Sequence, residues 1–348
     1  MNEAYCGPRD FPGYQKSTAR TICYILYLLE SFAETVYLGD IYIYILAILI
    51  NIFHFLVLTR KSMRSSSINI IMAYVAFFDI ASQFYWIQQE VNSYYQDVQI
   101  CVHGKFWYYL QVIGNFLYWI HSVSRRHSTW LSFSIAVIRT LVVRYPMNTS
   151  FEKLSKPKTA HLCVIGLSIL TLPLIVLGFF EKEAWYVGWT PCEPSGSFKY
   201  WNTGTSDFFM ANKSFLFNLY NSADGILSKL KSRQQMMSSR TNKSTTKLVF
   251  YLAITFFLAE FPLGIITMLY IVIPSPKKFP MFPYFLYHFF NLFSLFLSVT
   301  TCTHMVVCLF LSSQYRETIS VFVCRGCVVK TKDSISLRTA PMTVTTIL

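Results

Sequence analysis

The sequence predicts an all-α membrane protein, a bundle of seven transmembrane helices, from its composition, its apolar runs and its charge distribution. Its 348 residues are 53% hydrophobic and only 14% charged, whereas a typical soluble domain carries about 25% charged residues. The apolar residues form continuous runs of about 20 or more, the length with which a helix crosses a bilayer. These runs do not alternate with polar residues as membrane β-strands do.

Six segments have the composition of membrane spans, and a seventh is weaker. The six are 37–58, 68–89, 108–139, 160–180, 248–273 and 282–311. The weaker segment, 208–228, contains Lys213, Asp224 and several Asn and Ser residues. The predicted organisation is an extracellular N-terminus over 1–36, a transmembrane bundle over 37–311 and a cytoplasmic tail over 312–348.

The distribution of charged residues between the two sides of the membrane supports seven spans rather than six. With seven, one side of the membrane carries 19 Lys and Arg residues against three acidic ones, and the other carries 9 basic and 11 acidic residues. The first side consists of segments 59–67, 139–159, 229–247 and 312–348. The positive-inside rule places this side in the cytoplasm and the N-terminus outside. The net charge of +13 therefore reflects orientation in the membrane, and we expect no nucleic-acid partner.

Enzyme and transport functions find little support in the sequence. It has no P-loop, no Rossmann glycine pattern and no HExxH motif, and we predict no enzyme activity. Cys324-x-x-Cys327 is a single pair in the tail, a weak zinc signal by itself. A transporter or channel is the less favoured alternative, because broken helices or repeated halves are not visible.

Marker residues follow one another through the spans. Asn51 precedes Arg60 by nine positions, Asp79 follows Asn69 by ten, Arg139 precedes Pro146 by seven, and Glu260-Phe261-Pro262 lies in the segment 248–273, the sixth of the seven spans. In this order they resemble the markers of rhodopsin-like G-protein-coupled receptors. The segment Ser312–Arg316 is similar to the start of the short amphipathic eighth helix of that family.

Longer phrases resemble one subfamily, the nematode serpentine receptor class W, which is similar to FMRFamide-type neuropeptide receptors. The phrases include LTRKSMR (58–64), RTLVVRYPM (139–147), TFFLAEFPLG (255–264) and SSQYR (312–316). The resemblance implies a multi-pass receptor of the plasma membrane, in contact with its lipids. Its expected partners are an extracellular peptide ligand and a heterotrimeric G protein.

The resemblance also implies roles for single residues. Arg139, followed by Arg144, would contact the G protein; the alternative is a positive-inside anchor. A polar core is expected from Asn51, Asp79, Ser128 and His304. In the family such residues surround a sodium ion or a water cluster, and a water-filled core without sodium is equally open here. Otherwise no cofactor is expected.

Two arginines lie on the outer side of Arg139. Arg125 and Arg126 are about 20 Å from it along the helix, and neither should face lipid. Glu260 stands where the family has a switch tryptophan, so we predict an ion pair between Glu260 and one of these arginines. The pair would be either a switch in the ligand pocket or a static structural contact.

The cysteines outside the spans have predicted roles of two kinds. The resemblance implies a disulfide between Cys101 and Cys192 on the oxidising outer side, for which Cys6 and Cys23 could compete. Cys324 and Cys327 suit palmitoylation beyond the eighth helix, or they are reduced cytoplasmic thiols.

The resemblance departs from the family at the fifth span. Gly225-Ile226-Leu227-Ser228-Lys229 is followed almost at once by a basic loop, where relatives carry a long apolar run. The alternative function is therefore a receptor remnant, or a faulty gene model, whose defective fifth helix no longer supports coupling.

Overall fold

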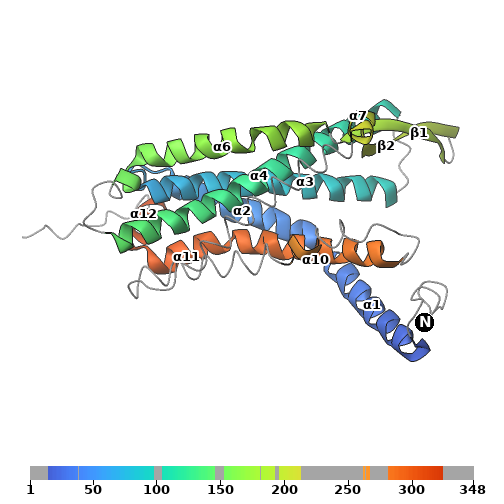
Figure 1. Ribbon diagram of the computed structural model, residues 1–348, viewed down its shortest axis with the longest axis horizontal. Coiled ribbons are helices and arrows are strands. Elements are labelled where there is room, and N and C mark those ends of the chain that lie inside the picture. The colour runs from blue at the N-terminus through green and yellow to red at the C-terminus, as the bar shows by residue number, and fades with distance from the viewer. Residues whose placement is uncertain are drawn as a thin grey trace, which may run out of the picture.

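The computed structural model has an elongated helical bundle at its centre (Figure 1). It describes residues 15–37, 39–97, 104–145, 153–180, 182–192, 196–212, 262, 264–266 and 281–323. The bundle helices are α2 (Asp40–Leu58), α3 (Ser67–Asp97), α4 (Gly104–Arg144), α6 (Pro157–Phe179), α10 (Met281–Thr301) and α11 (Thr303–Leu311). They lie lengthwise beside one another, with α3 packed against α2, α4 and α6.

Three described helical segments are long and apolar enough to cross a membrane. They are Asp40–Leu58, Ser67–Tyr95 and His288–Phe310, and each coincides with a predicted span. Two helices are longer than the spans predicted for them. α3 continues past residue 89 to Asp97, and α4 extends from Gly104 to Arg144. Hydropathy marks only the part of a helix inside the bilayer, whereas the backbone ladder continues into polar sequence.

The last span is divided at Cys302 into α10 and α11, whereas the sequence predicted one continuous helix. Hydroxyl side chains on both sides of the break donate to backbone carbonyls three residues earlier. Thr301 Oγ1 bonds Ser298 O at 2.7 Å and Thr303 Oγ1 bonds Thr300 O at 2.6 Å. Such back-bonding bends helices, so the local Ser/Thr content accounts for the break.

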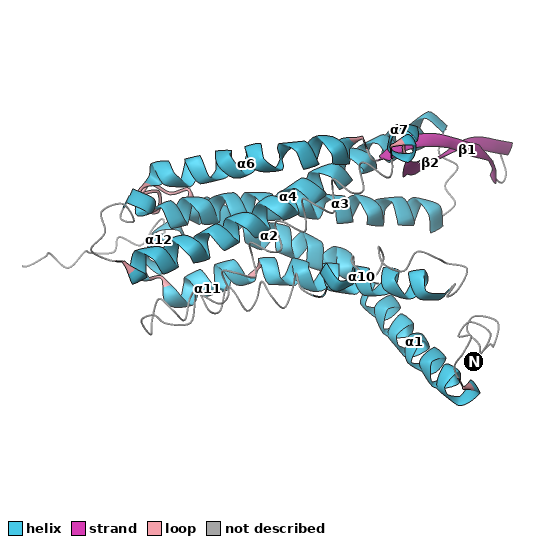
Figure 2. Ribbon diagram, in the orientation of Figure 1, coloured by secondary structure: helices cyan, strands magenta, loops and turns pink. Residues whose placement is uncertain are grey.

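Two elements at one end of the bundle were not foreseen. A helix, α1 (Lys16–Tyr37), leaves the bundle at an angle (Figure 1). An antiparallel hairpin of β1 (Lys182–Cys192) and β2 (Gly196–Thr205) lies beyond the end of α4 (Figure 2). Trp201 of β2 packs on Tyr108 of α4 with ring centroids 4.9 Å apart. This contact anchors the hairpin over the outer part of α4.

The opposite end holds the apolar core and a terminal helix, α12 (Ser313–Val323). The core joins α2, α3, α4 and α6 with α11 and α12. Tyr315 of α12 is fully buried, and its hydroxyl lies 2.6 Å from His54 Nδ1 of α2. Burial raises the pKa of the Tyr315 phenol, which keeps it protonated as a hydrogen-bond donor. α12 occupies the segment in which the eighth helix was expected.

The loops beside α12 add further contacts at this end. Ser62, in the loop between α2 and α3, lies 3.1 Å from the hydroxyl of Thr318, and Gln314 donates to Ser62 O at 2.6 Å. The short 3₁₀ helix η2 (Lys153–Ser155) precedes α6, and Ser67 of α3 donates to Leu154 O at 2.7 Å. The described basic loops therefore gather at the end opposite α1 and the hairpin.

The weak fifth span lies almost wholly outside the described residues. A single short helix, α7 (Asp207–Ala211), begins where this span was predicted to begin, and Ser206 caps it by accepting from Phe209 N at 3.2 Å. The predicted span 248–273 is described only at 262 and 264–266. The count of seven spans therefore remains a prediction, and three of the predicted spans coincide with described segments that are long and apolar enough to cross a membrane.

Candidate functional site

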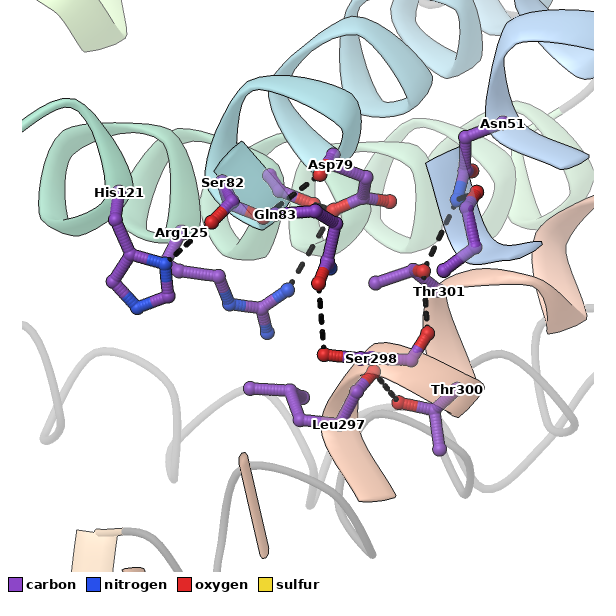
Figure 3. A network of polar contacts seen from close by, with 12 residues as sticks. Asn51, Asp79, Ser82, Gln83, His121, Arg125, Leu297, Ser298, Thr300 and Thr301 are labelled. Carbon is purple, nitrogen blue, oxygen red and sulfur yellow. Dashed lines mark hydrogen bonds and ion pairs between the residues drawn. The ribbon is translucent and has the colours of Figure 1, made fainter. Parts of the chain in front are cut away.

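The polar core of the bundle centres on Asp79 of α3 (Figure 3). Asp79 is 1% exposed, and its Oδ1 accepts a hydrogen bond from Ser128 Oγ at 2.6 Å. The same oxygen lies 3.6 Å from Nη1 of Arg125. Ser128 and Arg125 are three positions apart on α4, so they share one helix face and reach one carboxylate. The charge of this buried carboxylate is thus compensated by a cation from the neighbouring helix.

The core continues outward from Asp79 through Ser82 to His121. Ser82 Oγ donates to Asp79 O at 2.8 Å. His121 Nδ1 lies 2.8 Å from Ser82 O, and because a carbonyl only accepts, this nitrogen donates. His121 is one helical turn from Arg125 on α4. A chain of polar contacts therefore leads from the ion pair toward the outer end.

A second branch joins α2 and α3 to the last span. Asn51 Nδ2 donates to Thr301 Oγ1 at 3.1 Å, and Ser298 Oγ donates to Gln83 Oε1 at 2.9 Å. Thr301 and Ser298 are themselves bonded, as described above, so the two contacts form one network (Figure 3). His304, one turn further on, interacts electrostatically with Asp79, Arg125 and His54.

An outer cavity of about 590 Å³ opens above this network. Side chains of α2, α3, α4, α10 and the hairpin line it, including Asp40, Glu90, His121, Lys182 and Asn291. His121 belongs both to the cavity wall and to the polar chain. The outer cavity and the buried ion pair are therefore joined through one side chain.

The comparison with family models decides the family. The model of the serpentine type 7TM GPCR chemoreceptor Srw matches residues 39–326. The chain belongs to the Srw family. The resemblance inferred from the sequence is thereby confirmed, and the protein is a multi-pass membrane receptor of the GPCR class. No curated protein matches the chain.

The structure of this Srw receptor brings the four predicted core residues together, although only some of them touch. Asp79 and Ser128 are in direct contact, whereas Asn51 reaches Thr301 and His304 interacts electrostatically with Asp79. Gln83, Ser298 and Thr301 are additional members that the sequence analysis did not single out. Their buried polar character within apolar helices was the signal that could have found them.

Arg125 has a partner that the sequence did not indicate. Glu260 was predicted to pair with Arg125 or Arg126, and the structure shows Arg125 beside Asp79. The spacing of three to Ser128 was the available clue. Glu260 lies outside the described residues, so its pairing with one of the two arginines stays a prediction.

The position of Arg125 bears on the predicted sodium ion. A sodium ion bound to Asp79 would share the carboxylate with a guanidinium already 3.6 Å away. Two like charges on one carboxylate repel. The residues present therefore fit sodium poorly, and the built-in cation of Arg125 takes the role that a bound ion would have.

The predicted coupling residue lies near the inner end of α4. Arg139 is half-buried, and its Nε has no hydrogen-bond partner among the described residues. It interacts electrostatically with Cys308 of α11. Ile138, which stands where the family has an acid, is 6% exposed and belongs to the apolar core. The arginine therefore has no acidic neighbour at position 138.

The remaining predicted site residues lie outside the described part of the chain or have undescribed side chains. They are Arg144, Cys101, Cys192, Cys324 and Cys327. Cys23 of α1 is disulfide-bonded, and its partner is not among the cysteine side chains that the structure describes. The predicted Cys101–Cys192 pairing thus stays a prediction, with Cys23 among the competitors that the sequence analysis named.

Proposed function

We propose that this receptor binds an extracellular ligand, a neuropeptide, in the outer cavity and activates a heterotrimeric G protein at the opposite end. The observation that carries the proposal is the polar chain from His121 in the cavity wall to the Asp79–Arg125 ion pair. A ligand that moves His121 changes the position of α4. Because Arg125 lies one turn from His121 on the same helix, this movement displaces Arg125 relative to Asp79.

The inner end of α4 carries the residue that contacts the G protein in this proposal. Arg139 lies about 20 Å from Arg125 along one continuous helix. Arg139 is half-buried and its Nε is enclosed, so the guanidinium lies against the bundle. Movement of α4 or α11 frees this cation, and a free guanidinium binds backbone carbonyls and carboxylates of a partner. In this proposal the freed Arg139 contacts the G protein.

The peptide character of the ligand draws support from the cavity. Its volume of about 590 Å³ falls in the usual range for ligand sites of about 300–1,000 Å³. A cavity of this size can hold the terminal residues of a peptide, with the rest of the peptide extending past the hairpin to the outside. The wall offers side-chain amides at Gln89, Asn115 and Asn291, together with Asn202 and Thr203 of the hairpin. Such groups can bind the amides of a peptide backbone.

The proposal is tested in cells that carry the receptor together with a panel of G-protein dissociation sensors. Fractionated extract of the source animal is applied with and without prior protease digestion. We expect a response that digestion removes and that Arg139→Ala abolishes at unchanged surface expression. A response that survives digestion would refute the peptide ligand. A response that survives Arg139→Ala would refute the coupling role of that arginine.

The alternative function, a receptor remnant that no longer couples, is decided by the same cells. It predicts normal surface expression with no response from any sensor to any fraction. The length of the fifth span can be read independently, from the transcript sequence around residue 225. An in-frame apolar exon at that point would remove the reason for this alternative.

A further inference from the structure

We propose that the outer cavity recognises a positively charged group of its ligand, an ammonium or guanidinium, and that Asp40 is the principal anchor. The inference rests on the proposed receptor function and adds the chemical class of the ligand. Its basis is a carboxylate pair with two aromatic rings at the outer ends of α2 and α3.

Asp40 is the first residue of α2 and lines the cavity. It is only 4% exposed, and its Oδ1 has no hydrogen-bond partner among the described residues. The carboxyl group also interacts with the Tyr44 side chain and the Ile41 backbone, so Oδ1 is the oxygen left without a partner. A buried carboxylate oxygen without a partner is costly, because it has lost its hydrogen bonds to water. A cationic donor in the cavity would satisfy this oxygen.

Glu90 of α3 brings a second carboxyl group to the same cavity. It interacts electrostatically with Asp40, so the two acids repel each other, and a cation between them relieves this repulsion. Besides its tyrosines, the wall contains two further titratable groups, Lys182 of β1 and His121 of α4. The Lys182 ammonium lies 3.5 Å from the ring centroid of Tyr118. When both acids are ionised and His121 is neutral, two carboxylates face one ammonium.

On each of the two helices, α2 and α3, the acid and the aromatic ring are four residues apart. Tyr44 comes four residues after Asp40 on α2, and Trp86 comes four residues before Glu90 on α3. Residues four apart lie on one helix face, so each helix presents an acid and a ring together. Tyr44 and Trp86 stack across the helix interface with centroids 5.8 Å apart. The rings therefore lie beside both acids.

Aromatic faces attract cations, and this cavity already contains one example in Lys182 above Tyr118. Both ring faces and carboxylates prefer a positive group, and the two preferences coincide at the Asp40 and Glu90 end of the cavity. A neutral ligand would leave Asp40 Oδ1 with a weaker partner. The arrangement therefore favours a positively charged ligand over a neutral one.

The test uses the full-length receptor purified in detergent, without a G protein, and measures thermal unfolding with three small probes. N-acetyl-argininamide and N-acetyl-lysinamide each carry one positive charge, and N-acetyl-citrullinamide matches the first in shape but is neutral. A ligand that binds the folded state raises the melting temperature. At about 10 mM, a concentration suited to millimolar affinity, we expect one or both cationic probes to stabilise the receptor and citrullinamide to have no effect. The comparison between the two cationic probes separates guanidinium from ammonium.

Asp40→Asn should weaken binding of the effective cationic probe about tenfold to a hundredfold, the range of a charge-assisted hydrogen bond. Glu183→Gln is the matched control, because Glu183 is an exposed acid of the hairpin that does not line the cavity. It should leave binding unchanged. If Asp40→Asn does not fold, the comparison of charged and neutral probes on the unaltered receptor still tests whether the cavity recognises a cation.

Equal stabilisation by citrullinamide, or no stabilisation by either cation, would overturn the inference. So would unchanged binding of the cationic probe by a folded Asp40→Asn. These results are independent of coupling, because the assay contains no G protein. A receptor that binds the cationic probes but activates no sensor would contradict the proposed function alone. One that signals to a neutral ligand and ignores the cations would contradict this inference alone.

Discussion

Replacing Arg125 with Gln tests whether the polar core depends on a built-in cation. At 3.6 Å, the attraction between Arg125 and Asp79 is about 4–5 kcal/mol at an effective dielectric constant of about 20. Asp79 is 1% exposed, so water does not replace the lost partner. Removing one member of such a buried pair typically costs about 3–5 kcal/mol. We therefore expect Arg125→Gln to lower the free energy of unfolding by about this amount.

The assay is thermal unfolding of the purified receptor in sodium chloride or in choline chloride at equal ionic strength. The unaltered receptor should show no difference between the two salts. Arg125→Gln exposes Asp79 to an external ion, so sodium should stabilise that variant. With sodium at ten times its dissociation constant, the gain is about 1.4 kcal/mol. The double variant with Asp79→Asn should recover most of the lost stability and should not respond to sodium.

Arg126→Gln is the control, since it removes the adjacent arginine of the same helix and keeps the ion pair that Arg125 makes. It should produce no sodium response. The reasoning is refuted if the unaltered receptor is stabilised by sodium as strongly as Arg125→Gln. It is also refuted if Arg125→Gln unfolds no more easily than the double variant.

Three further changes have distinct expected results. Ser128→Ala removes the 2.6 Å hydrogen bond to Asp79, and the free energy of unfolding in chemical denaturation should fall by about 1.5–3 kcal/mol; a change below about 0.5 kcal/mol would contradict a charge-assisted bond. Tyr315→Phe keeps the packing but leaves His54 Nδ1 unpaired, so we expect a loss of about 1–3 kcal/mol, and His54→Phe added to it should lessen the loss. Arg139→Ala should leave probe binding unchanged while removing G-protein activation, and loss of both would indicate a folding defect.

Sequence reasoning could place the described spans because hydropathy reports burial in lipid directly. The family resemblance grouped Asp79 with Ser128 in one polar core, and the two side chains are in contact. The cost of a charge in lipid accounts for the inward-facing position of Asp79. The ion pair with Arg125 required knowing how α3 and α4 are rotated against each other. That rotation follows from side-chain packing along their whole length.

The outer cavity was less predictable for a different reason. Hydropathy does not reveal the burial of Asp40, since that burial depends on how α2 packs against neighbouring helices such as α3. The hairpin joins Lys182 and Asn202 from separate strands. Alternation in 182–205 is obscured by a register shift between Tyr186 and Gly188, and an aromatic-rich loop gives no clear period.

The contact between His54 and Tyr315 also has a consequence for the order of assembly. The two residues are 261 positions apart. The His54 ring on the first bundle helix therefore gains its hydrogen-bond partner only after nearly the whole chain has been inserted. Closing so long a loop is slow and comes late. A chain truncated before α12 would therefore retain an open polar site in its earliest span. The docking of the last helix on the first distinguishes a finished receptor from an incomplete one.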